Sequence, residues 1–155
     1  MPVTVTVTIR PMLPSEAHAV ASLRIETFFQ GSGRTAEEDA AALLTLPDDS
    51  FQASIVALEN DQLAGTALLV RKELDLESDR GPWLAGLAVS RPFRGRGIGA
   101  RLVKAVEQHA ASVGSDRIFL YTLGSEGFYA AIGWTIEERF VWHGQPAVIM
   151  TKALR

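Results

Sequence analysis

The sequence predicts a mixed α/β fold, in which a single domain spanning residues 1–155 is built on a central mixed sheet of six to seven strands with helices on both faces. A chain of this length suits one hydrophobic core. Its hydrophobic periodicity gives the element order β-α-α-β-β-β-α-β-α-β-β. The central strand–helix–strand unit requires parallel strands, whereas the flanking hairpins require antiparallel pairing, so the sheet must be mixed.

The N-terminal elements are an expected strand and an expected helix. Valines and an isoleucine alternate with threonines through residues 3–10, a period of two that predicts a strand. Pro11 and Pro14 are expected to end it. Ser15 is the expected N-cap of a first helix that runs to about Phe29.

A second helix and a hairpin follow. Thr35 with Glu38 three residues later forms a capping box, which predicts a helix over residues 36–46. Two apolar runs joined by a short polar turn then predict a hairpin. Its strands are residues 51–58 and 63–72, and a polar, acidic loop follows over residues 73–81.

The C-terminal half repeats the alternation of strands and helices. Residues 83–89 are apolar almost throughout, which is typical of a central strand covered on both faces. The remaining expected elements are a long helix over 98–113, a strand over 117–122, a short helix over 125–132, and a strand pair over 134–142 and 147–154.

Composition excludes several classes of site. The chain has no cysteine, so disulfides, thiolate metal sites and cysteine nucleophiles are excluded. His18, His109 and His143 share no ligand spacing, and no metal is predicted. A net charge of −3 gives no general basis for nucleic-acid binding. No apolar stretch suits a membrane helix, and the N-terminus does not resemble a signal peptide, so the expected compartment is the cytoplasm.

The most informative segment is a basic, glycine-rich turn between the strand over 83–89 and the helix that starts near Ile98. The first amides of a helix have no intrahelical acceptors, and the helix dipole adds positive potential there. Glycines let a phosphate approach the backbone closely. Four arginines add charge around the turn, at positions 91, 94, 96 and 101. These features predict a pyrophosphate site; the alternative is a solvated basic surface loop.

Two other phosphate-binding motifs fit less well. Gly95-x-Gly97-x-x-Ala100 formally matches a dinucleotide fingerprint, which would require an acidic residue at the end of the next strand. That strand ends in Tyr121-Thr122, so the acidic residue is missing. A P-loop is also excluded, because no Gly-Lys-Ser/Thr occurs in the chain.

Two signatures together resemble a known family. Residues Arg94 to Gly99 look like the acyl-CoA pyrophosphate motif of the GNAT acetyltransferases, Arg/Gln-x-x-Gly-x-Gly/Ala. Downstream, Phe128-Tyr129 followed by Gly133-Trp134 looks like the second signature of that family. The resemblance implies a single GNAT-like domain over the whole chain, with its sheet splayed between the fourth and fifth strands.

The resemblance also implies a reaction and a co-substrate. An N-acetyltransferase of this kind moves an acetyl group from acetyl-CoA to a primary amine by direct attack in a ternary complex, without a metal and without an enzyme nucleophile. The amine would belong to a small molecule or a peptide. The implied acyl-CoA-binding residues are Leu87, Ala88, Val89, Arg94, Gly95, Arg96, Gly97, Ile98, Gly99, Ala100 and Tyr129.

Within that set, particular roles are expected. Leu87 and Val89 would lend main-chain hydrogen bonds to the pantetheine arm. The amide of Leu87 or Ala88 would stabilise the charge on the thioester oxygen. Tyr129 would protonate the departing thiolate, and its alternative role is that of a core aromatic residue.

The base is where the sequence departs from the family pattern, because the expected fourth strand carries no glutamate. Glu26, at the end of the first helix, is the expected catalytic substitute. Glu73 and Asp75 stand behind it, and proton loss through ordered water is a further route. For each carboxylate the alternative is a solvated surface group.

Weaker expectations concern the acceptor side and partners. An acidic rim of Glu73, Asp75, Glu77 and Asp79 would attract a cationic amine. His143 in the last turn is expected to be exposed, and Trp83 packs the sheet or lines the acceptor pocket. A homodimer through the terminal strands is also expected. The rival functions are a non-catalytic module that binds and senses acyl-CoA, and RNA binding through Arg-Gly-Arg-Gly, which a single ordered copy disfavours.

Overall fold

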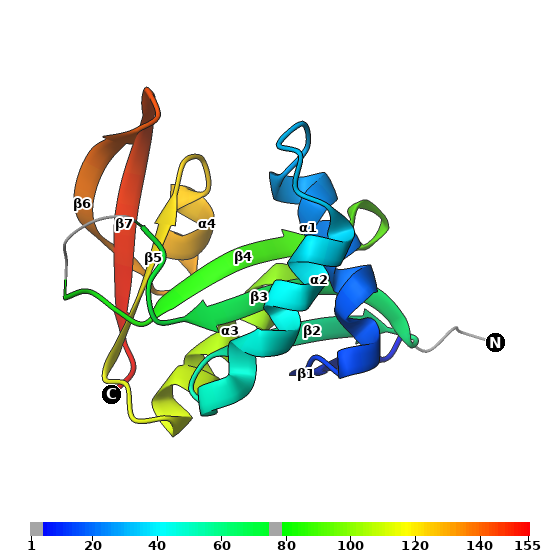
Figure 1. Cartoon of the computed structure of the whole chain (residues 1–155). Helices are drawn as coiled ribbons and strands as arrows, with labels where there is room; N and C mark the ends of the chain where they lie inside the picture. The colour runs from blue at the N-terminus through cyan, green and yellow to red at the C-terminus, as the bar shows by residue number, and fades with distance from the viewer. Residues whose placement is uncertain (1–4, 75–78) are drawn as a thin grey trace.

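A computed structural model of the chain describes residues 5–74 and 79–155, and it has the expected mixed architecture (Figure 1). Seven strands form one sheet in the order β1-β2-β3-β4-β5-β7-β6. The strands are β1 (Val7–Pro11), β2 (Ala53–Glu59), β3 (Gln62–Val70), β4 (Trp83–Val89), β5 (Arg117–Thr122), β6 (Thr135–Trp142) and β7 (Gln145–Ala153). The pairing of β4 with β5 is parallel, and every other pairing is antiparallel.

Helices cover both faces of this sheet, and an apolar cluster lies under each face. The α-helices are α1 (Ala17–Phe28), α2 (Ala36–Thr45), α3 (Ile98–Ser112) and α4 (Glu126–Ala131). Figure 1 shows α1 and α2 on one face, with α3 on the other. Val20 of α1 and Leu43 of α2 belong to one cluster, and Leu102 of α3 and Tyr129 of α4 belong to the other. No described helix has both the length and the apolarity needed to cross a bilayer.

The N-terminal boundaries differ from those expected. β1 begins at Val7, and residues 1–4 lie outside the described part of the chain. Ser15 does not cap α1. It lies instead in a 3-10 turn over Pro14–Glu16, and Glu16 is the N-cap residue of α1. Glu16 is held there by a bidentate ion pair with Arg10, in which both N–O distances are 2.8 Å. Its carboxylate also accepts a hydrogen bond from the amide of Leu13. The expected N-cap of the first helix is therefore wrong by one residue.

The two hairpins turn through two-residue loops. Asn60 and Asp61 join β2 to β3, and both residues have positive φ. His143 and Gly144 join β6 to β7 in the same way. Such loops match the right-handed twist of the flanking strands. The last turn is therefore shorter than the expected residues 143–146, and β7 begins at Gln145.

The central parallel pair separates as expected. Only Trp83 and Phe119 are paired in register between β4 and β5. Beyond that point β4 continues to Val89 with one edge unpaired on the β5 side, while β5 pairs along its whole length with β7. The sheet is therefore open between its fourth and fifth strands, at the carboxyl ends where ligands bind in open α/β sheets.

Close packing at Gly65 on β3 positions the start of α3. A Cβ at this residue would lie 2.8 Å from the carbonyl oxygen of Ala88 and 2.9 Å from a methyl carbon of Leu102. We therefore expect Gly65→Ala to lower the free energy of unfolding by about 1–3 kcal/mol, because a backbone atom must move to admit the methyl group. Urea denaturation of the purified variant measures this. A variant as stable as the wild type would show that β3 is not packed this tightly against Ala88 of β4 and Leu102 of α3.

Candidate functional site

The turn from β4 into α3 offers a run of backbone donors without protein acceptors. The Arg94 amide donates to the carbonyl of Arg91 at 3.3 Å, and the Arg101 amide donates to Gly97 at 3.2 Å. Between them, no amide from Gly95 to Ala100 has a hydrogen-bond acceptor in the described part of the chain. The N-cap residue Gly97 supplies no side-chain cap either. Six consecutive amides at the positive end of a 15-residue helix make a strong anion site.

The shape of this turn requires two of its glycines. Gly95 and Gly97 have φ of 80° and 79°, a left-handed conformation that costs little only for glycine. A Cβ at either residue would meet no atom within 4 Å, so the outer side of the turn is open. The backbone of the turn is therefore accessible to a bulky anion.

The arginine side chains of the turn divide into two kinds. Arg94 donates from Nε to the carbonyl of Val89 at 2.9 Å, so it ties the turn to the end of β4. Arg96 forms an ion pair with Glu59 at the end of β2. Arg91 and Arg101 are exposed and form no ion pair with any described residue. Among the described residues, Arg96 is thus the one arginine of the turn whose charge is paired with a carboxylate, and Arg91, Arg94 and Arg101 keep theirs for a ligand.

The open edge of β4 includes Leu87, Ala88 and Val89, as expected, and β4 also has a bulge. The register with β3 shifts between Thr66 and Leu68, where Gly86 and Leu87 lie opposite a single β3 residue. Gly86 has φ of 61°, and a Cβ there would lie 2.5 Å from Nη1 of Arg24. Sequence reasoning missed Arg24, which reaches the β4 bulge from α1.

Arg24 belongs to an ion cluster that we call the Asp39 cluster, in which the buried Asp39 pairs with both Arg24 and Arg34. Arg24 donates to Asp39 from Nε at 2.8 Å, and Arg34 donates from Nε at 2.9 Å. The Asp39 side chain is 1% exposed and that of Arg24 is 10% exposed. Both guanidinium groups lie against the ring of Phe29. The cluster thus fixes the end of α1 and the start of α2 beside β4.

Tyr129 lies on the opposite side of the opening, on α4. Its ring is buried and makes edge contacts with Phe128 and Trp134, at centroid distances of 5.0 and 6.1 Å. Its hydroxyl has no hydrogen-bond partner among the described residues. Burial raises the pKa of Tyr129 to about 12, so the phenol stays protonated across the neutral range. A protonated phenol can donate to a nearby anion.

Phe128 links Tyr129 to the glycine-rich turn. Its ring lies 3.5 Å from where a Cβ of Gly99 would be, and a methyl group of Val89 lies 3.7 Å from the same point. The end of β4, the first turn of α3 and α4 therefore meet around Gly99. Phe128 stays exposed at that junction, which gives the site one apolar wall.

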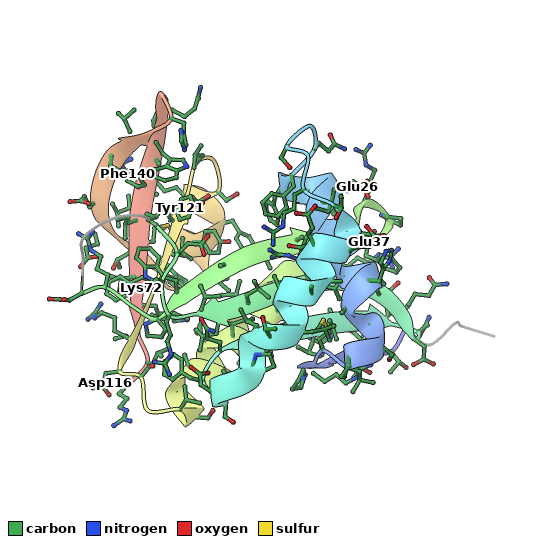
Figure 2. The ribbon with its side chains drawn as sticks, viewed as in Figure 1. Glu26, Glu37, Lys72, Asp116, Tyr121 and Phe140 are labelled. Atoms are coloured by element: carbon green, nitrogen blue, oxygen red, sulfur yellow. The ribbon has the colours of Figure 1, made fainter. Side chains whose placement is uncertain are left out.

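A second group of aromatic side chains lies around Tyr121 of β5. The Tyr121 ring is 6.0 Å from Trp142, which contacts Phe140 at 6.4 Å and His143 at 4.5 Å. Figure 2 places Tyr121 on β5 and Phe140 on the neighbouring hairpin. His143 is exposed, as expected. Trp83 packs against Phe119 in the core and donates to the carbonyl of Arg80, so it is a packing residue.

The candidate bases differ in their surroundings. Glu26 is exposed near the end of α1 (Figure 2) and has no hydrogen-bond or ion-pair partner among the described residues. Glu73 is exposed as well, but neighbouring atoms partly desolvate its carboxyl group and raise its pKa to about 7, although the charge of Arg24 opposes the shift. The charge of Glu73 in turn adds to burial in raising the pKa of Tyr121. Glu73, Arg24 and Tyr121 therefore share one electrostatic environment.

The described residues include only part of the expected acidic rim. Asp75 and Glu77 lie outside the described residues, and Asp79 is exposed. Within the described ranges, no three His, Asp or Glu side chains gather as a metal site would require. The arrangement that the structure does bring together comprises an anion-binding helix start, an open strand edge, a buried phenol, and a carboxylate with a pKa near neutrality.

Comparisons with known proteins agree with this geometry. The model of the acetyltransferase (GNAT) family matches residues 17–134. Mouse N-alpha-acetyltransferase 80 is 31% identical over 94 residues, a segment that covers 58% of this chain and 30% of the mouse protein. The chain thus matches less than a third of that relative's length.

Solved structures extend the likeness to almost the whole chain. An aminoglycoside 6'-N-acetyltransferase complexed with coenzyme A superposes with a TM-score of 0.75 and 19% identity, covering 96% of this chain and 97% of that one. An acetyltransferase of Salmonella typhimurium with acetyl-CoA gives 0.79 and 14%, covering 96% and 94%. At these identities the likeness shows a shared fold.

Proposed function

The chain belongs to the GNAT acetyltransferase family, and from that premise we propose that it transfers an acetyl group from acetyl-CoA to a primary amine. The amine attacks the thioester carbonyl directly in a ternary complex. The C–N bond of an amide forms, the C–S bond breaks, and one proton leaves the nitrogen while the thiolate sulfur gains one. The acceptor is an amine on a small molecule or a peptide.

The observation that carries this proposal is the run of six acceptor-free amides beside the open edge of β4. The residues there fit the co-substrate, because amides from Gly95 to Ala100 suit a diphosphate. The unpaired edge from Leu87 to Val89 suits an amide-bearing pantetheine arm, which can add to it as a strand would. The Leu87 or Ala88 amide, next to the bulge, is the proposed donor to the thioester oxygen.

Two side chains are proposed to move the protons. Tyr129 donates to the departing sulfur, since its phenol is protonated and has no other acceptor. For the base we propose Glu73 rather than Glu26. A carboxyl group with a pKa of about 7 is well matched to accept a proton at neutral pH, and Glu73 is electrostatically coupled to Arg24, which lies against the β4 bulge.

Calorimetric titration with coenzyme A, followed by an acetyl-CoA consumption screen over amines, tests the proposal. We expect binding together with turnover of at least one class of amine. Absence of binding would reject acyl-CoA as the ligand. Binding without turnover of any small amine, amino acid or peptide would favour the alternative of a sensing module.

The pH profile tests the base. Below pH 7 the Glu73 carboxyl is protonated and cannot accept a proton, so kcat/KM should fall about tenfold per pH unit there. Glu73→Gln should remove this acid limb and lower kcat/KM at pH 8 by about 10²-fold. The measurement is kcat/KM from pH 5 to 9 for both proteins.

Glu26→Gln is the matched control for that profile. Because Glu26 is exposed and has no described partner, its variant should keep the acid limb near pH 7. If Glu26→Gln flattened the limb and Glu73→Gln preserved it, the base would be Glu26. A limb preserved in both variants would assign proton removal to water.

A further inference from the structure

The anion-binding turn is attached to a distant hairpin by one ion pair. Nη1 of Arg96 donates to Oε2 of Glu59, the last residue of β2, which lies 37 positions away in the sequence. The guanidinium group of Arg96 also lies 5.8 Å from the centroid of the Phe93 ring, just before the turn. The side chain in the middle of the turn therefore points back to the protein.

Glu59 is an unusual partner because it is buried. Its side chain is 8% exposed, whereas that of Arg96 is 49% exposed. Its second oxygen, Oε1, is buried without a hydrogen-bond partner. A buried carboxylate costs free energy unless it is paired, so Glu59 depends on Arg96. Its position is set by the two-residue turn at Asn60 and Asp61, which fixes the end of β2.

The turn has few other constraints of its own. Arg96 lies between Gly95 and Gly97, which both have left-handed φ, and a Cβ at either glycine would touch nothing within 4 Å. Glycines leave the unfolded and open forms of a loop many conformations, so the anion-binding shape must be held by its side-chain contacts. In the described structure those contacts are Arg94 on Val89 and Arg96 on Glu59.

We propose that Glu59 is a positioning residue for acyl-CoA, which acts through Arg96 to hold the turn over residues 94–100 in its anion-binding shape. The inference rests on the proposed function, since it takes acyl-CoA as the ligand. The charge of Arg96 is used inside the protein, and the diphosphate is held by backbone amides. A preformed site pays less ordering entropy on binding.

A rival role for Arg96 predicts the opposite change in Kd when the ion pair with Glu59 is broken. If Arg96 were a direct phosphate ligand restrained by Glu59, breaking the pair would free its charge and tighten binding. If Glu59 positions the turn, breaking the pair leaves the amides less ordered and weakens binding. The direction of the change in Kd therefore decides between the two roles.

The test uses Glu59→Gln in the full chain, with coenzyme A as the calorimetric probe and acetyl-CoA in the kinetics. We expect Kd for coenzyme A and KM for acetyl-CoA to rise about tenfold, with kcat within about twofold of the wild type. Arg96→Met should weaken binding similarly, and the double variant should be no worse than the weaker single variant, because both remove one contact.

Glu16→Gln provides a matched control for the loss of an ion pair. Glu16 pairs with Arg10 on another part of the fold, so its variant should leave Kd and KM unchanged even if it lowers stability. If Glu59→Gln does not fold, Arg96→Lys keeps Glu59 paired and should give a smaller rise in Kd. Unchanged or tighter binding in Glu59→Gln, or in Arg96→Lys where that variant is the one used, would overturn the inference. A wild type that does not bind coenzyme A would instead reject the proposed function.

Discussion

Replacing Tyr129 by phenylalanine should lower kcat by about 10²- to 10³-fold and leave the Kd for coenzyme A within about twofold. The ring is buried among Phe128 and Trp134, and Phe keeps these contacts. Only the hydroxyl is lost, and it has no described protein partner whose loss would unfold the site. Stopped assays of acetyl-CoA consumption and calorimetry measure the two quantities separately.

The chain's other tyrosine serves as the control. Tyr121 lies on β5 within the aromatic group of Trp142, and Tyr121→Phe keeps its ring. We expect it to change kcat far less than Tyr129→Phe does. Because burial raises the pKa of Tyr129 to about 12, the wild type should also show no loss of kcat from phenol ionisation up to about pH 10. A Tyr129→Phe variant with wild-type kcat would leave the phenol a packing role.

The glycine-rich turn and the fold were predictable because their signals are local. The anion site depends on where a strand ends and a helix begins, and on glycines between them, all within residues 89–102. The same holds for the Thr35 capping box, which the structure confirms. The parallel pairing of β4 and β5 followed from the strand–helix–strand order, and it is confirmed as well.

Other features could not be predicted because they depend on contacts between distant residues. Arg24 reaches Asp39, 15 positions away, and also the bulge at Gly86. Glu59 meets Arg96 only because the β2–β3 hairpin is folded back beside α3. A lone arginine or glutamate in a sequence carries no sign of such a partner.

The Asp39 cluster should produce the largest effect on stability. Asp39→Ala leaves Arg24 nearly buried without its carboxylate, and Arg34 loses the same partner. We expect the free energy of unfolding to fall by about 3–5 kcal/mol, because an uncompensated buried charge is costly. Guanidinium or urea denaturation of Asp39→Ala and the wild type, with equal slopes in denaturant, gives the difference.

Asp116 shows why burial rather than charge decides this outcome. It pairs with Arg155 at 3.0 Å, much as Asp39 pairs with Arg24, yet its side chain is 77% exposed (Figure 2). Water replaces the lost partner at such a surface site, so Asp116→Ala should leave stability nearly unchanged. Equal losses in the two variants would mean that the cluster is solvated. In that case Arg24 would not be held against the β4 bulge, and its charge would no longer oppose the rise in the pKa of Glu73.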